Sequence, residues 1–163
     1  MAGQATRATA ELDRAGASYQ VHQYAVDEKV GEGYGEAVAK AIGMASDRVF
    51  KTLVAEVDDE VLVAVVPVAR RLSAKKLAQA VEGKRCALAS PATAERDTGY
   101  VPGGISPFGR RKRQPLVLDS SAFQHETIAV SGGRRGLQLE LTPATLLEVT
   151  GGVTADIADE WQI

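Results

Sequence analysis

Apolar and polar positions alternate with a period of two along several stretches of the chain, a pattern typical of half-buried β-strands. The clearest stretches are 49–57 and 61–68, which are joined by the acidic turn Asp58-Asp59-Glu60. Shorter stretches of the same kind predict further strands at 18–24, 86–89, 116–120, 127–130, 137–141 and, at a sheet edge, 153–157.

Other stretches repeat their apolar residues at helical spacing. They predict helices over 6–15, 35–42, 73–81, 91–97 and 142–149. Gly16, Gly43 and Gly83 follow three of these segments, where glycine commonly ends a helix. Strands outnumber helices and do not strictly alternate with them. The predicted fold class is therefore α/β (α+β), with a mixed, curled, barrel-like sheet surrounded by helices.

Length and composition fit one globular unit. The chain has 163 residues, 45% of them apolar and 25% charged, so a single domain over 1–163 is expected. No apolar run approaches the roughly 20 residues that span a bilayer, and the first residues lack the layout of a secretion signal. The one cysteine, Cys86, cannot form an internal disulfide. These features favour a cytoplasmic protein that is not bound to a membrane.

Lys51 is a lone lysine in an otherwise apolar predicted strand. Strand alternation places it on the same face as Val49 and Leu53, so its ammonium points where apolar side chains pack. A buried charge is costly without a partner, and such charges concentrate at functional sites. The alternative is a lysine that reaches from a strand edge into solvent.

A glycine- and proline-rich loop over 99–109 offers a complement to this lysine. Gly103 and Gly104 let the backbone approach a ligand closely, and Pro102 and Pro107 stiffen the loop. A cation beside exposed backbone N–H groups suits a phosphate, a carboxylate or a developing oxyanion.

The net charge of −2 conceals a segregation of charge along the chain. Between residues 70 and 135 there are 13 Lys and Arg against 5 Asp and Glu. The longest basic run directly follows the glycine-proline loop and consists of Arg110, Arg111, Lys112 and Arg113. Basic density beside a candidate site indicates a polyanionic partner such as a nucleic acid, although a charge run is more often ordinary solvated surface.

Several common chemistries are not supported by the residues. His22 and His125 are the only histidines, and neither has the spacing of a metal-ligand motif. The sequence contains no phosphate-binding loop with a GxxxxGK[ST] pattern and no GxSxG nucleophile elbow. Cys86 lies in an apolar stretch and is expected to be a small core residue. An enzyme with this sequence therefore has no obvious protein nucleophile, general base, metal or cofactor.

Taken together, four motifs resemble the YbaK/EbsC family of bacterial Cys-tRNA(Pro) deacylases, which are related to the editing domain inserted in prolyl-tRNA synthetases. These motifs are the stretches 49–53 and 98–109, the basic run after them, and 130–136. Their order and spacing match along essentially the whole chain. The family fold is a mixed, barrel-like sheet with outer helices, which agrees with the predicted elements.

The resemblance assigns the family's essential lysine to Lys51. It assigns the pocket for the aminoacyl group to Tyr24, Tyr34, Thr52, Gly103, Gly104, Ile105, Ser106, Pro107, Ser131, Gly132 and Gly133. We expect the backbone N–H groups around Gly103 and Gly104 to hold the ester carbonyl oxygen as it becomes negative. The basic run Arg110 to Arg113 is expected to contact tRNA or a protein partner. Gln138 stands where members vary and receives no role.

The activity implied is the removal of cysteine from Cys-tRNA(Pro), with Cys-tRNA(Cys) as a further substrate. The cysteinyl thiol would attack its own ester, and Lys51 would orient the tRNA end or transfer a proton. The implied partners are aminoacyl-tRNA and prolyl-tRNA synthetase, with no metal or cofactor. Two alternatives remain open: an editing deacylase for another small amino acid such as alanine or serine, and a non-catalytic module that binds tRNA or a synthetase.

Overall fold

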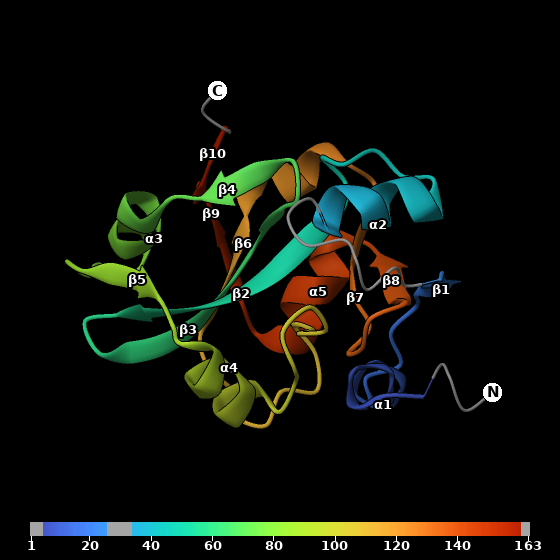
Figure 1. Cartoon of the computed structure of the whole chain (residues 1–163), viewed down its shortest axis with the longest axis horizontal. Coiled ribbons are helices and arrows are strands. Elements are labelled where there is room, and N and C mark those ends of the chain that lie inside the picture. Colours follow the sequence, from blue (N-terminus) through green and yellow to red (C-terminus); the bar gives the residue numbers. More distant parts are fainter. Residues whose placement is uncertain (1–4, 26–33, 161–163) are drawn as a thin grey trace.

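The fold combines short helices with three small sheets (Figure 1). The computed structural model describes residues 5–25 and 34–160. The helical segments are α1 (Arg7–Arg14), α2 (Tyr34–Ile42), α3 (Ala74–Ala80), α4 (Pro91–Thr98), the 3₁₀ segment η2 (Ser120–Gln124) and α5 (Pro143–Thr150). The strands are β1 (Gln20–Gln23), β2 (Phe50–Val57), β3 (Glu60–Pro67), β4 (Arg70–Leu72), β5 (Cys86–Leu88), β6 (Leu116–Asp119), β7 (Ile128–Ser131), β8 (Leu137–Leu141), β9 (Val153–Ala155) and β10 (Ala158–Glu160).

The largest sheet is mixed and has the strand order β5-β2-β3-β6-β9. Its β3–β6 and β6–β9 pairs are parallel, whereas β2 is antiparallel to both of its neighbours. A second, antiparallel sheet has the order β1-β8-β7, and β4 pairs with β10. Within the described residues these sheets stay open and do not close into a barrel. The predicted mixed α/β architecture is confirmed.

The two larger sheets meet at the start of β2. The backbone N–H of Ala129, on β7, donates to the carbonyl of Arg48 at 3.0 Å, and Val49 forms an isolated parallel bridge with Ala129. On the other side, the N–H of Val68 donates to the carbonyl of Val49 at 2.8 Å. The junction therefore lies only two residues before Lys51 in the sequence.

The first half of β2 keeps an open edge. β3 pairs with β2 along its whole length, but β5 pairs only with the segment Ala55 to Val57. Because the β7–β8 pair approaches β2 at Val49, a gap remains beside residues 50–53. Side chains from both faces of β2 can reach this gap.

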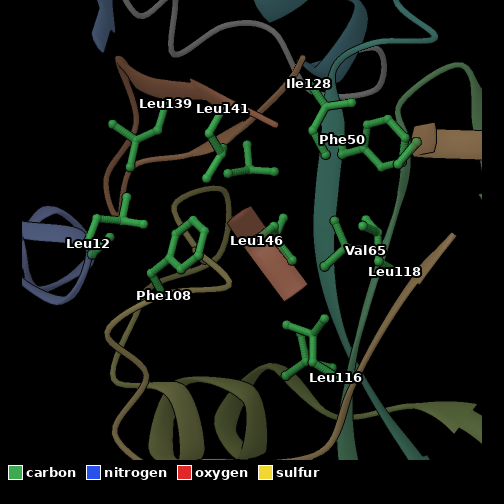
Figure 2. Packing of buried hydrophobic residues seen from close by; sticks show 14 residues of the cluster. Leu12, Phe50, Val65, Phe108, Leu116, Leu118, Ile128, Leu139, Leu141 and Leu146 are labelled. Carbon is green, nitrogen blue, oxygen red and sulfur yellow. The ribbon is translucent and has the colours of Figure 1, made fainter. Parts of the chain in front are cut away.

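A buried apolar cluster fastens the glycine-proline loop to the rest of the protein (Figure 2). Phe108, at the end of this loop, is fully buried and lies between Leu12 of α1 and Leu146 of α5. Burying a phenylalanine side chain stabilises a fold by roughly 1.5–3 kcal/mol. The loop is thus held at its C-terminal end by the core.

The predicted strands and helices all appear in the structure, with shifts of a few residues at their ends. The strands β4 and β10 and the 3₁₀ segment η2 were not predicted from the sequence. No helix among the described residues is long and apolar enough to cross a membrane.

Candidate active site

A cavity of about 160 Å³ lies where α2, β2, the glycine-proline loop and the facing ends of β7 and β8 come together. It is smaller than the roughly 300–1,000 Å³ of pockets that enclose drug-sized ligands, so it suits a small chemical group. The lining residues are Tyr34, Gly35, Val38, Val49, Phe50, Lys51, Thr52, Leu53, Val68, Gly103, Ile105, Ser131 and Gln138.

Lys51 lines this cavity from β2 and is half-buried. Burial lowers the pKa of its ammonium, because removal from water disfavours the charged form, while the nearby carboxylate of Glu36 on α2 raises it. A poorly solvated cation interacts more strongly with an incoming anion than an exposed one does. The predicted proximity of Lys51 to the glycine-proline loop is found, since Gly103 and Ile105 line the same cavity.

Two buried oxygens at the cavity have no hydrogen-bond partner among the described residues. They are Oγ1 of Thr52 and Oε1 of Gln138, whose side chains belong to residues only 8% and 6% exposed. A buried polar atom without a partner costs about 1–3 kcal/mol, so such atoms often mark the place of a ligand. Gln138 received no role from the sequence, because nothing local reveals that its amide oxygen is left without a donor.

The glycine-proline loop brings Gly103, in a left-handed conformation with φ of +86°, to the cavity. Gly104 is not among the lining residues, and its N–H donates to the carbonyl of Val101 at 3.0 Å. The Gly104 N–H is therefore already engaged in this conformation, and its contact with an oxyanion stays a prediction. Within the described chain, no hydrogen bond occupies the N–H groups of Gly103 and Ile105, which are the available donors.

Other loop residues support the site without lining it. Tyr100 donates its hydroxyl to the carbonyl of Phe108 at 2.5 Å, and burial raises the pKa of this tyrosine to about 12. The hydroxyl of Ser106 accepts the N–H of Phe108 at 3.2 Å, and both Ser106 and Pro107 are buried. These contacts fix the course of the loop.

The turn between β7 and β8 contributes Ser131 to the cavity. Gly132 donates its N–H to the carbonyl of Leu137 at 2.8 Å, and Gly133 donates to Oγ of Ser131 at 3.1 Å. Gly132 and Gly133 therefore shape the turn and orient Ser131, while their own atoms are not among those that line the cavity.

Tyr24 stands behind the cavity wall. Its hydroxyl lies 3.4 Å from that of Tyr34 and accepts a long hydrogen bond from Nε2 of Gln138 at 3.5 Å. Burial, followed by the hydrogen bond with Tyr24, raises the pKa of Tyr34, so the Tyr34 hydroxyl is neutral at physiological pH. Tyr24 thus positions two residues that face the ligand space.

Arg135, which the sequence left without an individual role, covers the aromatic wall of the cavity. Its guanidinium lies 4.9 Å from the centre of the Tyr34 ring, a distance that favours a cation–π interaction. It also lies against Gly103, where an added Cβ would come within 2.5 Å of Nε of Arg135. The side chain therefore connects α2, the β7–β8 turn and the glycine-proline loop.

The basic run after the loop does not line the cavity. Arg110 donates to the carbonyls of Pro107 and Gln114 at 2.9 and 3.0 Å, and burial lowers the pKa of its guanidinium. Arg113 donates to the carbonyl of Val149 at 3.1 Å, and Lys112 pairs with Asp97 at 3.4 Å. Arg111 makes a longer contact of 3.4 Å with the carbonyl of Arg96. Much of this basic charge therefore holds neighbouring segments in place.

Among the described residues, those that line the cavity supply hydroxyl groups, an amide and an ammonium, and none of them is a histidine, a cysteine or a carboxylate. In the described parts of the chain, no group of three or more His, Cys, Asp and Glu side chains could hold a metal ion. The described lining residues therefore offer a cation and neutral hydrogen-bonding groups, and no histidine or carboxylate among them could act as a general base for a hydroxyl nucleophile.

Comparison with known proteins identifies the family. The sequence profile of the aminoacyl-tRNA editing domain matches residues 33–149, and the chain belongs to this family. The resemblance to the YbaK/EbsC proteins is confirmed.

The chain is 41% identical over 124 residues to EbsC of Enterococcus faecalis, named as a proposed Cys-tRNA(Pro)/Cys-tRNA(Cys) deacylase, with 75% of each chain covered. It is 30% identical over 148 residues to the multifunctional Ser/Thr-tRNA deacylase ProXp-y of Escherichia coli K12, with 88% of this chain and 86% of the relative covered. Both relatives are named as tRNA deacylases.

A solved structure described as a proposed trans-editing enzyme for prolyl-tRNA synthetase has the same fold. It superposes with a TM-score of 0.83 at 24% identity, over 94% of this chain and 95% of that one. The family and these relatives support a tRNA-editing deacylase.

Proposed function

We propose that the protein removes a small amino acid, cysteine in the first place, from mischarged proline tRNA. The observation that carries this proposal is Lys51, a partly desolvated cation in a small cavity bounded by the glycine-proline loop. The 41% identity to EbsC supports cysteine as the amino acid. A cavity of about 160 Å³ favours a small side chain and excludes large ones by size.

The composition of the cavity wall favours a nucleophile that belongs to the substrate. Within the part of the chain that the structure describes, no histidine, cysteine or carboxylate lines the cavity to activate water or a hydroxyl. A cysteinyl thiol has a pKa near 8.5, and a nearby cation such as Lys51 stabilises its thiolate. The thiolate would attack its own ester carbon, a reaction in which intramolecular placement makes the nucleophile locally abundant.

In this reaction a bond forms between sulfur and the ester carbon, and the bond from that carbon to the ribose oxygen breaks. The proton lost by the thiol ends on the ribose hydroxyl, and the product is a cysteine thiolactone that water then opens. The Lys51 ammonium and the N–H groups of Gly103 and Ile105 would stabilise the negative charge that develops on the oxygens. The amide oxygen of Gln138 would accept a hydrogen bond from the α-amino group of the substrate.

The test incubates purified protein with proline tRNA charged with cysteine, serine or alanine and compares the rates at which the three amino acids are released. We expect fast loss of cysteine, slow loss of serine and alanine, and recovery of the thiolactone. Replacing Lys51→Met should reduce deacylation about 100-fold or more, because one group that stabilises developing charge contributes on that scale. Lys40→Met, at an exposed position of α2, is the matched control and should leave the rate unchanged.

A second candidate is a deacylase for serine or threonine esters that uses water, supported by the 30% identity to ProXp-y. Faster release of serine than of cysteine would favour this activity and argue against the thiol mechanism. Binding of tRNA with no loss of any amino acid would contradict both activities and favour a non-catalytic module. The tRNA contact proposed for the basic run 110–113 predicts weaker, salt-sensitive binding when its charge is reversed.

A further inference from the structure

A second cavity adjoins the candidate active site and shares a wall with it. It measures about 270 Å³, and both cavities are lined by Lys51 and Leu53. Because these two β2 residues are separated by one position, their side chains lie on the same side of the strand. The rest of the second cavity is lined by Arg71, Leu72, Ala74, Cys86 and Leu88, which come from β4, α3 and β5.

The wall of the second cavity is mostly apolar and carries one further cation. Leu88 is 63% exposed on the three-residue edge strand β5, so its side chain is open to a ligand. Arg71 is half-buried on β4, opposite Asp159 of β10, and takes part in none of the salt bridges among the described residues. An apolar surface can hold a nucleobase, and an arginine beside it can bind the phosphate of the same nucleotide.

We propose that the second cavity binds the 3′-terminal nucleoside of an acylated RNA, with the base against Leu72 and Leu88 and the 5′ phosphate paired with Arg71. This proposal rests on the proposed function of the first cavity. When the aminoacyl group fills the first cavity, its ester lies beside Lys51. The ribose then continues across Lys51 and Leu53, the two residues that both cavities share.

The positions of the arginines agree with a nucleoside that extends from Lys51 into the second cavity. The arginines at 110 and 113 donate to backbone carbonyls and line neither of the two cavities. Arg71 is the arginine that lines the cavity adjoining Lys51. Guanidinium groups bind phosphate oxygens in a bidentate geometry, so Arg71 is suited to fix the terminal phosphate.

The first experiment detects the nucleotide directly in the wild-type protein. Protein with ¹³C-labelled leucine methyl groups is titrated with the trinucleotide CCA, which ends in a free 3′ hydroxyl. We expect the methyl signals of Leu53, Leu72 and Leu88 to shift, while those of the core residues Leu139 and Leu146 stay in place.

The second experiment separates binding from chemistry with Leu88→Glu and Arg71→Gln. Each should raise KM for Cys-tRNA(Pro) about tenfold or more with kcat within twofold of wild type. Neither should change the rate on cysteine methyl ester, which has no nucleoside. The matched controls are Val153→Glu, at a position 57% exposed on β9, and Arg14→Gln, at an exposed position on α1. Both controls should behave as wild type.

The outcomes distinguish this proposal from the proposed function. If the three leucine signals do not move with CCA and both variants keep the KM of their controls, the nucleoside site is wrong, even when deacylation is found. If CCA shifts these signals but no aminoacyl ester is cleaved, the nucleoside site is supported and the deacylase is wrong.

Discussion

At the scale of single residues, the candidate site combines one partly buried ammonium group with two buried oxygens that lack a hydrogen-bond partner among the described residues. Lys51 is held where water is scarce, which lowers the pKa of its ammonium. Thr52 and Gln138 each bury an oxygen that the described protein does not satisfy. Burial of the Lys51 charge opposes stability, and so does burial of the two oxygens without a partner. A ligand that donates hydrogen bonds to the two oxygens removes the second cost.

The substitution Thr52→Val tests this interpretation, because it should raise stability and lower activity. The substitution removes the unpaired hydroxyl at nearly constant shape, so we expect the free energy of unfolding to rise by about 1 kcal/mol. Deacylation should fall about tenfold, because the ligand loses a hydrogen bond. Urea denaturation and the deacylation rate measure the two effects.

Thr98→Val is the matched control. The buried hydroxyl of Thr98 donates to the carbonyl of Ala94 at 2.6 Å and accepts the N–H of Tyr100, so the same substitution should lower stability there by about 1 kcal/mol. A loss of stability in both variants would contradict the claim that the Thr52 hydroxyl lacks a partner.

At the scale of elements, the cavity depends on close contact between two loops. Gly104 is buried against the β7–β8 turn, where an added Cβ would come within 3.0 Å of the Cα of Arg134. Gly103 lies against the guanidinium of Arg135, which in turn covers the ring of Tyr34. The loop, the turn and α2 therefore set the shape of the cavity together.

Gly103→Ala should disturb the contact between the glycine-proline loop and Arg135, and should lower both stability and activity. Alanine at φ of +86° is disfavoured by roughly 1–2 kcal/mol, and its Cβ would displace Arg135 from Tyr34. We expect both lower stability and at least tenfold slower deacylation. Gly43→Ala, at φ of +72° with open space around it, should lose similar stability but keep its activity. Equal activities of the two variants would argue against a role for the loop contact.

Local patterns predicted most elements but not those that depend on distant pairing. β4 and β10 contain three residues each, and their register places Arg70 opposite Glu160 and Arg71 opposite Asp159. Cross-strand pairs of this kind stabilise a strand, yet they join segments almost 90 residues apart and leave no periodic signal. The alternation around Lys51, in contrast, is a local property and placed β2 and its lysine correctly.

The site was partly predictable for the same reason. Lys51 lines the cavity, and so do five of the residues assigned to the pocket from the sequence: Tyr34, Thr52, Gly103, Ile105 and Ser131. Gln138 and Arg135 were missed because their roles depend on contacts with Tyr24, Tyr34 and Gly103 across the fold. The contact of the basic run with tRNA stays a prediction.

At the scale of the whole molecule, one carboxylate links the two larger sheets. Glu140 on β8 accepts hydrogen bonds from Thr127 at 2.6 Å and pairs with His22 of β1 at 2.8 Å. Arg48, just before β2, lies 3.6 Å from the same carboxylate and also donates to Thr127. The hydrogen bonds from Thr127 and then His22 lower the pKa of Glu140.

This lowered pKa predicts a dependence of stability on pH. A carboxylate whose pKa is lower in the folded state stabilises the fold above the ordinary glutamate pKa, and the effect is lost as pH falls through the folded pKa. Between neutral pH and about pH 3, the wild type should therefore lose more stability than Glu140→Gln, by up to about 1 kcal/mol. Thermal unfolding at several pH values measures this difference.

Glu148→Gln, at an exposed position of α5, is the control and should follow the wild type. Parallel pH profiles for the wild type and Glu140→Gln would mean that the carboxylate contributes nothing to the coupling of the two sheets.

The bridge between Val49 and Ala129 has a further consequence, because it joins sheets that carry opposite walls of the cavity. Lys51 belongs to one sheet, and Ser131 and Gln138 belong to the other. A small slide of one sheet against the other alters the width of the ligand space without unfolding either. Substitutions in the hydrophobic core of either sheet, even far from the cavity, are therefore expected to change the selectivity between amino acids. This change should occur in variants that still fold.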